Sequence, residues 1–433
     1  MERYSEYKES GVQWIGEIPS HWKLYALKYI LQEKKESVGC FSYKYDLLSL
    51  TLKGIIKRNM DNPAGKFPSS FDTYKIVHKN DFVFCNFDNE ETPRAVGLSN
   101  YKGMITGAYD VFSCKRNDVS NRFLLYLFLS IDNMKQFKPL YKGLRKTIPL
   151  DSFMSYKIAI PPLLEQQSIA DYLDKVTSKI DEAIAQQQKM IDLLNERKQI
   201  IINNAVTKGL NPDVPMKYSG VDWIGEIPEH WTTIRLGYCA WIRARLGWKG
   251  LKSDEYVDNG YPFLSAFNIV NNKLDWNKLN YINKFRYEES PEIKLRIGDI
   301  LLVKDGAGIG KCARVDSLPL GEATANGSLA FITANERVYY KFLHYYIISN
   351  SFNKYKDLLI TGMGVPHLTQ GEIKNMMLPI PPLNEQYIIV QRLDKNINVI
   401  DNILEHYLQQ ITFLQERKRI IINDVVTGKV KVS

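Results

Sequence analysis

The sequence is poor in the residues that build disulfide frameworks and metal centres. Its five cysteines are odd in number and form no CxxC pair, and its six histidines show no HExxH or similar metal-binding spacing. These absences exclude a disulfide scaffold and a zinc module, and we predict no metal ligand. No apolar run approaches the ~20 residues that cross a bilayer, and the N-terminus is polar and charged. We therefore expect a cytoplasmic protein with no membrane contact.

Two catalytic signatures are also missing. The run Gly306–Lys311 is similar to a phosphate-binding loop, but Asp305 occupies the position of that motif's first glycine and Cys312 that of its Ser or Thr. We interpret this run as a glycine turn beside a strand. The two Asn-Pro pairs, at 62–63 and 211–212, are not followed by the second proline and the aromatic residue of an adenine-methylation motif. The sequence thus predicts no catalytic residue in this chain.

The charge is moderately basic. The chain has 57 Lys and Arg against 48 Asp and Glu, a formal net charge of +9. The segments 161–208 and 381–433 together cancel, so the excess lies in the remainder of the chain. An excess of this size favours a polyanionic partner, but it suits a basic protein without such a partner equally well. The hydrophobic content of 45% is enough for several buried cores.

The feature that organises the chain is a repeat. Residues 161–207 and residues 381–427, which lie 220 positions later, align without a gap and are identical at 22 of 47 positions. Both copies begin with two prolines and carry a glutamate in the first turn, which is typical of a helix start. No glycine or proline interrupts either copy, and Gly209 and Gly428 follow as C-terminal stops. We predict two helices of about 40 residues, each roughly 60 Å long.

Apolar residues recur in both copies at alternating steps of three and four, the pattern of a coiled-coil seam. The predicted seam consists of Ile169, Leu173, Val176, Ile180, Ala183, Met190, Leu194 and Ile201 in the first helix and of Ile389, Leu393, Ile400, Ile403, Leu414 and Ile421 in the second. We expect the two helices to pair antiparallel within one chain, with Leu173 near Leu414. Gln187 and Tyr407 interrupt the seam and are candidates for fixing its register. Helices buried in one larger core are the alternative.

A shorter repeat lies near the start of each half. Residues 10–22 read SGVQWIGEIPSHW and residues 219–231 read SGVDWIGEIPEHW, identical at 11 of 13 positions. We call these two segments the clasps. Their tryptophans and isoleucines stand on a turn-forming frame of glycine and proline. We expect each clasp to pack the start of its domain against a long helix; a contact surface for a partner is the alternative.

The segments between clasp and helix, roughly 23–160 and 232–380, resemble each other only faintly. Each contains a strand-like run, then a short apolar helix pattern, then a glycine loop; these lie at 81–84, 122–130 and 142–149 in the first and at 299–303, 341–349 and 361–368 in the second. The order clasp, domain, helix therefore occurs twice.

We predict an α+β fold in which two similar mixed α/β domains are joined by two long antiparallel coiled-coil helices in a pseudo-two-fold internal repeat. The expected parts are the first clasp and domain, the first helix, a linker, the second clasp and domain, and the second helix with a tail. Their boundaries are 1–160, 161–208, 209–222, 223–380 and 381–433.

The clasp S-G-V-x-W-I-G-E-I-P-x-H-W, the helix start P-P-L-x-E-Q and the helix end E-R-K-x-I-I-I-N…V-T resemble the specificity subunit of type I restriction–modification enzymes. The resemblance covers both halves of the chain, and its motifs occur twice in the same order. It implies a non-catalytic subunit in which each of two target recognition domains reads one half of an asymmetric, bipartite DNA site. It also implies that the helices set the spacer between the half-sites.

The same resemblance implies the partners. They are double-stranded DNA, two methyltransferase subunits that dock around the helices and, in some complexes, restriction subunits with translocase activity. No cofactor is expected in this chain. S-adenosylmethionine, ATP and Mg²⁺ are expected on the partner subunits.

Candidate DNA contacts follow from the chemistry of base edges and phosphates, which Arg, Lys and polar side chains recognise. Each candidate is explained equally well as an ordinary solvated charge. In the first domain they are Lys57, Arg58, Arg94, Lys142, Arg145 and Lys146. In the second they are Arg243, Arg245, Lys249, Lys304, Lys311, Arg314, Thr361, His367 and Thr369, with Trp241 and Trp248 interleaved.

Two other functions are compatible with the sequence. One is an enzyme that carries its own recognition domains; the missing signatures disfavour it, and a methyl-transfer assay on the lone chain would detect it. The other is a coiled-coil assembly scaffold without DNA readout, which would show no salt-dependent binding to DNA.

Overall fold

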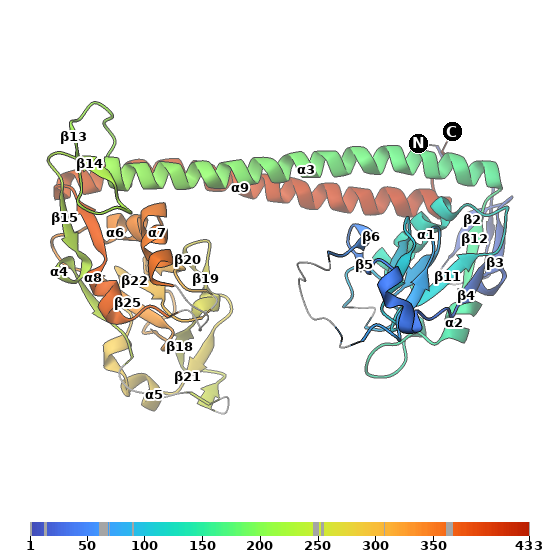
Figure 1. Cartoon of the computed structure of the whole chain (residues 1–433), viewed down its shortest axis with the longest axis horizontal. Coiled ribbons are helices and arrows are strands. Elements are labelled where there is room, and N and C mark those ends of the chain that lie inside the picture. Colours follow the sequence, from blue (N-terminus) through green and yellow to red (C-terminus); the bar gives the residue numbers. More distant parts are fainter. Residues whose placement is uncertain are drawn as a thin grey trace. The chain divides into compact units, whose positions relative to one another are not determined.

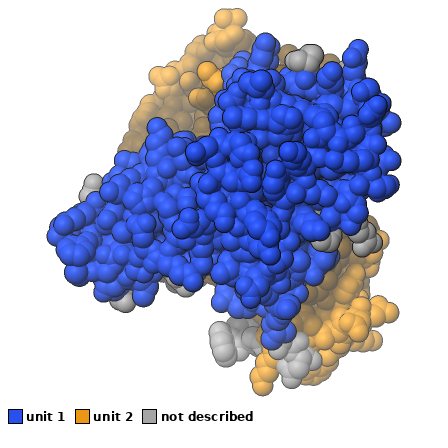
Figure 2. Space-filling model, turned by 90° about the vertical axis from the view of Figure 1, so that its right-hand side faces the viewer, with its two compact units in different colours: residues 1–187, 408–433 blue, residues 188–407 orange. Residues whose placement is uncertain are grey.

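The computed structural model describes residues 2–12, 15–59, 68, 70–88, 91–245, 251–252, 255–306, 308–360 and 367–432. The chain divides into two compact units, residues 1–187 with 408–433 (the first unit) and residues 188–407 (the second unit), coloured separately in Figure 2. The helices α3 (Leu163–Lys208) and α9 (Leu383–Val426) each contribute one part to either unit (Figure 1). The two long helices predicted from the repeat are therefore confirmed. No helix within the described ranges is long and apolar enough to cross a membrane.

The first unit is built on a four-stranded antiparallel sheet in the order β4-β11-β8-β9. Its strands are β4 (Leu31–Lys34), β8 (Phe82–Phe84), β9 (Val96–Leu98) and β11 (Asp110–Cys114). The central strand β8 is buried on both faces. On one face Phe84 packs edge to face on Phe128 of helix α1 (Asn121–Asn133), with ring centroids 5.0 Å apart. On the other face Val83 joins a smaller core under the hairpin of β5 (Leu48–Thr51) and β6 (Gly54–Lys57).

The remaining elements of the first unit are short. They are the pairs β1 (Tyr7–Glu9) with β2 (Glu17–Pro19), β3 (Lys23–Ala26) with β12 (Lys157–Ile160), β5 (Leu48–Thr51) with β6 (Gly54–Lys57) and β7 (Lys75–Val77) with β10 (Gly103–Ile105), and helix α2 (Leu150–Ser155). Because β12 leads directly into α3, the pair β3–β12 fixes where the long helix leaves the domain.

The second unit repeats the central sheet, in the order β16-β25-β22-β23. Its strands are β16 (Ala240–Arg243), β22 (Asp299–Val303), β23 (Cys312–Arg314) and β25 (Leu329–Ala334). Helix α6 (Tyr340–Ile347) covers one face, where Phe342 and Tyr346 share a core with Ile300 and Leu302. The strand and helix patterns seen in the sequence at 81–84, 122–130, 299–303 and 341–349 are thus confirmed.

The second unit differs in its other layer. A second four-stranded sheet, β17-β21-β18-β24, is present there, with β18 and β24 parallel. The further elements are β17 (Tyr256–Val257), β18 (Tyr261–Leu264), β21 (Asn280–Ile282), β24 (Thr324–Ala325), the pairs β13 (Met216–Tyr218) with β14 (Glu226–Pro228), β15 (Thr232–Arg235) with β26 (Met377–Ile380) and β19 (Ile269–Val270) with β20 (Lys273–Leu274), and helices α4 (Leu236–Cys239), α5 (Lys284–Glu288), α7 (Asn350–Leu359) and α8 (Gln370–Asn375).

The two long helices pair antiparallel within each unit, as predicted. In the first unit Asp181 of α3 lies 2.6 Å from Lys418 of α9. In the second unit Lys198 of α3 lies 2.5 Å from Asp401 of α9. Within the first unit alone, Asp181 is paired with Lys418 and Gln187 with Gln410, so residue numbers rise along one helix as they fall along the other.

The seam was predicted correctly for most positions. Ile169, Leu173, Ile180, Ile389, Leu393 and Ile400 are buried, and Val176, Leu194, Ile201, Leu414 and Ile421 are half-buried. The prediction was wrong for Met190 and Ile403, which are 41% and 40% exposed. After Ile400 the next seam position lies four residues on rather than three, so it is occupied by half-buried Leu404 and not by Ile403. Gln187 does lie at the seam, where its amide donates to Gln410 Oε1 at 3.0 Å.

Each clasp joins the beginning of one long helix to the end of the other. In the first unit the indole of fully buried Trp22 donates to the Glu165 carboxylate at 3.0 Å, and His21 Nε2 lies 2.7 Å from its other oxygen. Gly428, just beyond α9 at φ +75°, lies against Trp22, where a side chain would meet the clasp. In the second unit Trp231 donates to Glu385 at 3.1 Å, and Gly209 has the matching position.

The expected role of the clasps, packing the start of each domain against a helix, is therefore confirmed, although Trp14 lies outside the described residues. The clasp also explains the register of the helix pair. It holds the two helix ends level, so Leu173 shares its core with Ile422 and Val425 rather than with Leu414. The expected contact was misplaced by about three turns.

A buried glutamine connects each long helix to the short helix of its domain. Gln166 accepts a hydrogen bond from the backbone N–H of Ser120 at 2.8 Å, and its amide donates to the carbonyl of Pro161 at 2.8 Å. Gln386 repeats this with Tyr339 at 2.7 Å and Pro381 at 2.9 Å. The Glu-Gln of the repeated P-P-L-x-E-Q motif thus fixes the domain on its helix. The glutamate binds the clasp, and the glutamine holds the start of α1 or α6.

Candidate nucleic-acid interface

In the first unit two loops meet at one end of the central sheet. The loop after β8 contacts the predicted glycine loop 142–149 through its backbone. The N–H of Ile148 donates to the carbonyl of Asn86, and the N–H of Asp88 donates to the carbonyl of Arg145, both at 2.8 Å. The glycine loop is therefore held by the sheet.

The basic side chains of this loop differ in their availability. The Arg145 guanidinium lies 3.1 Å from the Asp88 carboxylate and 5.2 Å from the centre of the Phe87 ring, although its side chain is 72% exposed. Lys142 is exposed, and its side chain has no charged partner among the described residues. Lys146 is half-buried and has contacts of its own. Lys142 is thus the cation most available to a phosphate.

The second unit places its own pair of loops in the same way. The N–H of Leu368 donates to the carbonyl of Lys304 at 2.8 Å, as Ile148 does in the first unit. Asp305 forms ion pairs with Lys304 Nζ, at 2.6 Å, and with His367. Burial acts to raise the pKa of Asp305, but hydrogen bonds from Lys304 and His367 outweigh it and hold that pKa below its usual value. The structure thus brings together two predicted candidates, while Thr361 lies outside the described residues.

The described part of the glycine run, Gly306 and residues 308–311, forms a turn between two antiparallel strands. The Val303 N–H donates to the Lys311 carbonyl at 2.8 Å, and the Gly310 N–H donates to the Val303 carbonyl at 2.9 Å. Cys312 then begins β23, whereas a phosphate-binding loop leads into a helix. The interpretation as a glycine turn is confirmed, and exposed Lys311 lies on it. Within the described part of the chain no three His, Cys, Asp or Glu residues are placed to hold a metal ion.

Arg243 was wrongly predicted as a surface contact. It is only 3% exposed, and its Nη2 lies 2.5 Å from the Asp299 carboxylate, which is fully buried. Its Nη1 donates to the backbone carbonyls of Glu292 and Lys294 at 2.9 and 3.0 Å. Trp241, two residues earlier on the same face of β16, is 54% exposed, but Arg243 itself is enclosed and supports the core.

Two other candidates, Arg245 and Thr369, also have structural roles, and a third, Arg94, is half-buried. Arg245 is largely buried and lies 3.4 Å from Glu289, so its prediction as a surface contact was wrong too. The Thr369 hydroxyl caps α8, accepting from the Glu372 N–H at 3.1 Å and donating to the Glu372 carboxylate at 2.8 Å. Arg94 is half-buried, and burial lowers its pKa. Lys249 and Trp248 lie outside the described residues.

The last three candidates are held by carboxylates or partly buried. Lys57 lies 2.6 Å from Asp46, whose hydrogen bond raises the pKa of the lysine. Arg58 is half-buried. Burial acts to lower the pKa of Arg314, but a hydrogen bond to Asp316 at 2.8 Å outweighs it and raises that pKa. Arg314 lines a cavity rather than an open surface.

The structure also exposes a group that the sequence analysis missed. Phe41 and Tyr43, the latter 77% exposed, stand beside Lys44, whose Nζ lies 4.6 and 5.6 Å from their ring centres. In the second unit exposed Arg296 lies 5.4 Å from the ring of Trp241. Aromatic faces with adjacent cations suit bases and phosphates. The signal was present as the run Phe-Ser-Tyr-Lys at 41–44.

Comparison with known proteins agrees with this arrangement. The family model "Type I restriction modification DNA specificity domain" matches residues 75–191 and 228–412, more than half of the chain. The type I restriction enzyme MjaVIII specificity subunit of Methanocaldococcus jannaschii is 29% identical over 377 residues, which are 86% of this chain and 84% of that protein. The type I restriction enzyme EcoBI specificity subunit of Escherichia coli is 25% identical over 258 residues, 57% of this chain and 52% of that protein.

A solved structure has the same fold. A chain from a study of complex assembly and conformational transition in the type I R-M system gives a TM-score of 0.68 at 16% identity, with 95% of this chain and 99% of that chain covered. The duplicated units and the family match define an internally repeated DNA specificity protein. The chain belongs to the type I restriction–modification DNA specificity family, as a specificity subunit. The alternative of a coiled-coil scaffold without DNA readout finds no support in these comparisons.

Proposed function

We propose that the two domains read the two different halves of an asymmetric, bipartite DNA site. The observation that carries this proposal is the repetition of one scaffold with two different loop pairs. The backbone bond from Ile148 to Asn86 recurs from Leu368 to Lys304 at the same 2.8 Å. The side chains on these loops differ, however, so the two domains offer different hydrogen-bonding groups to DNA.

The long helices are proposed to set the spacer between the half-sites and to dock two methyltransferase subunits. The repeat supports two copies of one partner, since each half of the chain presents the same helix motif. In this proposal the chain itself has no catalytic activity and works in the cytoplasm. S-adenosylmethionine, ATP and Mg²⁺ belong to the methyltransferase and restriction subunits of the assembled complex.

Exchanging one domain tests independent reading. A chimera that carries a foreign 23–160 segment is expected to change one half of the methylated motif and to leave the other half as it was. Sequencing the methylome of cells with the wild-type chain or the chimera gives both motifs directly. A change in both halves would contradict independent domains.

Lengthening the helices tests the spacer. One heptad inserted into both α3 and α9 adds ~10 Å of helix, about three base pairs at 3.4 Å per step. The spacer of the methylated motif is expected to grow while both half-sites stay the same. Insertion into α3 alone is the matched control, since it puts the helix pair out of register and should abolish methylation. An unchanged spacer in the double insertion would contradict the proposed role of the helices.

Substitution of Arg145 distinguishes two modes of contact with DNA. If this guanidinium reads a base, Arg145→Ala should relax one half-site by about 1–3 kcal/mol of discrimination. If it holds a phosphate, the same change should weaken binding to every sequence evenly and lower its salt dependence. Titrations with variant duplexes at two salt concentrations distinguish the two outcomes, and no effect in either would remove Arg145 from the interface.

A further inference from the structure

Two large apolar side chains stand free in solvent at the loops of the candidate interface. Leu144, on the glycine loop of the first unit, is fully exposed, and Phe267 of the second unit is 93% exposed. No other large apolar side chain in the described part of the chain is more than 79% exposed. A single exposed leucine or phenylalanine needs no explanation by itself. What matters is how firmly each one is held and which groups surround it.

Leu144 is presented by a closed turn. The backbones of Lys142 and Thr147 exchange two hydrogen bonds, at 2.9 and 3.0 Å, and so close a tight turn around Leu144. The Asp88 N–H, from the loop after β8, donates to the Arg145 carbonyl at 2.8 Å and holds the turn on the domain. The leucine side chain therefore projects from the tip of a fixed hairpin.

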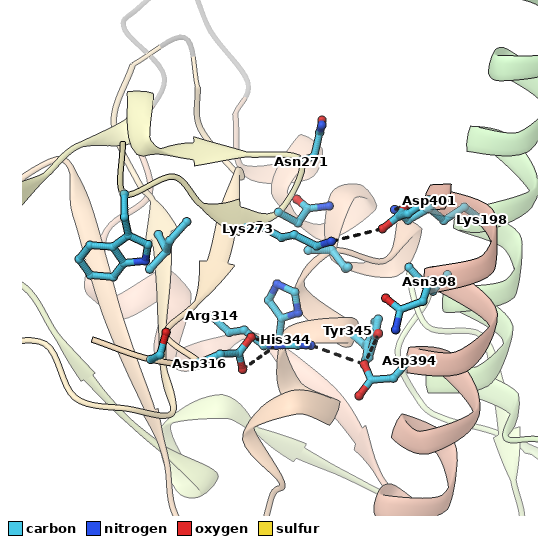
Figure 3. A pocket seen from close by; sticks show the side chains of 16 residues that line it. Lys198, Asn271, Lys273, Arg314, Asp316, His344, Tyr345, Asp394, Asn398 and Asp401 are labelled. Carbon is cyan, nitrogen blue, oxygen red and sulfur yellow. Dashed lines mark hydrogen bonds and ion pairs between the residues drawn. The ribbon is translucent and has the colours of Figure 1, made fainter. Parts of the chain in front are cut away.

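Phe267 is presented by a capped turn, the short helix η5 (Ala266–Asn268). The Phe267 N–H donates to the Ser265 hydroxyl at 3.4 Å, and the Ser265 N–H donates to the Asn268 side chain at 2.9 Å. Asn268 is buried, and its amide donates to the Lys278 carbonyl at 2.7 Å. The chain then enters the β19–β20 hairpin, which lines one side of the polar cavity beside helix α6 (Figure 3). A turn held in this way loses little conformational entropy when its tip is bound.

The helix η5 lies beside the glycine turn of the second unit. A side chain at Gly308 would lie 3.9 Å from Ala266 of η5 and 3.6 Å from Lys311. Residues 326–328 connect the two places, since their backbone bonds to the end of β18 at 2.8 Å and to the loop after β22 at 2.9 Å. Phe267 therefore stands at the same end of β22 as the candidate loops.

Each tip is the one large apolar residue of its turn, and cations stand close by. Exposed Lys142 and Arg145 lie on the same turn as Leu144. Exposed Lys311 lies on the glycine turn beside Phe267. A protein partner is bound through a contiguous apolar core from which charges are depleted. DNA, in contrast, offers apolar base faces between two rows of phosphates, which suits a lone apolar tip with cations beside it.

We propose that Leu144 and Phe267 act as wedges, each of which enters between two stacked base pairs of its half-site and opens that step. Burial of the apolar side chain favours the insertion, and unstacking opposes it to a degree that depends on the sequence of the step. Each wedge therefore makes the opened step part of the specificity without a hydrogen bond to a base. The inference rests on the proposed reading of two half-sites and adds how part of each one is read.

Fluorescent purine analogues test the proposal in the complex of the full chain with its methyltransferase subunits. The duplex carries the methylated motif, and the domain exchange described above assigns each half-site to its unit. An adenine or guanine analogue that brightens when it is unstacked replaces one purine at a time. The wild-type complex is expected to brighten one step in each half-site. The base that becomes methylated is left out, because methyltransferases take their target base out of the stack.

Matched variants separate the two wedges. Leu144→Ala is expected to remove the signal from the half-site of the first unit only, and Phe267→Ala from that of the second unit only. Leu144→Met and Phe267→Leu keep an apolar side chain and should keep the signal. Ile297→Ala is the control, because this residue is 66% exposed but precedes β22, whereas the candidate loops follow that strand. Both signals should survive in this variant.

A mismatch at the opened step gives a second measurement, because a mismatched step is cheaper to unstack. The wild-type complex is expected to bind the mismatched duplex about tenfold more tightly than the perfect one, and the alanine variant of that unit should show no such gain. If the motif is methylated but no analogue brightens, or if the signal survives both alanine variants, neither side chain is a wedge. Failure of these variants to assemble with the methyltransferase subunits would instead make the two tips protein contacts. If no bipartite motif is methylated, the proposed function itself fails, and the methylome shows this before any duplex is made.

Discussion

The two units hold their long helices with the same contacts and differ where the domains face outward. Tyr126 donates to Asp174 of α3 at 2.6 Å, and Tyr345 donates to Asp394 of α9 at the same distance. Against this constant frame, the first unit carries the two-stranded sheets β5–β6 and β7–β10, and the second unit carries a four-stranded sheet. The difference indicates that attachment to the helices and recognition are separate tasks of the domain, which can change independently.

The comparison extends into the cores. In the first unit Lys34 of β4 lies 2.9 Å from buried Asp81, and in the second Arg243 of β16 lies 2.5 Å from Asp299. The two ion pairs occupy matching places in the two sheets. They differ in burial, because the Lys34 side chain reaches solvent and that of Arg243 does not.

The largest expected effect comes from breaking these matched ion pairs. Arg243→Ala leaves the Asp299 carboxylate buried without its partner and should destabilise the second unit by about 3–5 kcal/mol. Lys34→Ala should cost less, about 1–3 kcal/mol, since water can reach its site. Denaturant unfolding of the purified chain measures both. An equal or larger loss in Lys34→Ala would show that burial does not distinguish the pairs.

The next effect concerns the clasps. The Glu165 carboxylate accepts hydrogen bonds from Trp22 and from Tyr4, the latter at 2.6 Å, and pairs with His21. Among the described residues, the Glu385 side chain has only the matching Trp and His contacts. We expect Glu165→Gln to cost about 1.5–3 kcal/mol, because hydrogen bonds to a charged acceptor are the stronger ones. Glu385→Gln should cost less. Unfolding curves of the two variants make the comparison, and the reverse order would mean that the Tyr4 contact contributes nothing.

Much of the frame was predictable from sequence because it depends on local patterns. Two prolines, an uninterrupted seam and a glycine stop define each long helix, and the duplication identifies its partner. The capping of α8 was also readable, since Thr369 and Glu372 have the spacing of a capping box. The capping-box spacing would have predicted Thr369 as a helix cap and not as a DNA contact.

The candidate site was less predictable because it depends on burial. Nothing local distinguishes Arg243, which is buried in β16, from Lys142 in an exposed loop. Likewise the partner of Arg145 is Asp88, 57 residues away, which only the meeting of two loops reveals. Charge alone therefore predicts a set of candidates, and the fold decides which remain available.

A further difference between the units depends on pH. The pKa of His344 falls from an ordinary 6.5 to about 3 on folding, so the unfolded chain binds the extra proton between these values. Its contribution to stability is complete above pH 6.5 and is lost as the pH falls toward 3, at up to about 1.4 kcal/mol per pH unit. We expect the wild type to lose stability faster than His344→Leu between pH 6 and 4. Denaturant unfolding at each pH measures both stabilities. If the wild type and His344→Leu lost stability equally over this range, the ring would not be neutral in the folded chain.

The smallest expected effect is at Lys142, and it bears on how the first unit meets DNA. This lysine is exposed, lies on the loop held by Asn86 and Asp88, and has no charged partner among the described residues. Such a side chain gains most by neutralising a phosphate, because no carboxylate has to release it first. Lys142→Ala should therefore weaken binding to all sequences evenly and lower the slope of log K against log[salt] by about 0.9. Lys8→Ala, on exposed strand β1, is the matched control and should leave the slope unchanged. Duplex titrations from low to moderate salt give the slope for both variants. If Lys142→Ala instead relaxed the preference at one half-site and left the slope unaltered, this lysine would read a base edge rather than neutralise a phosphate.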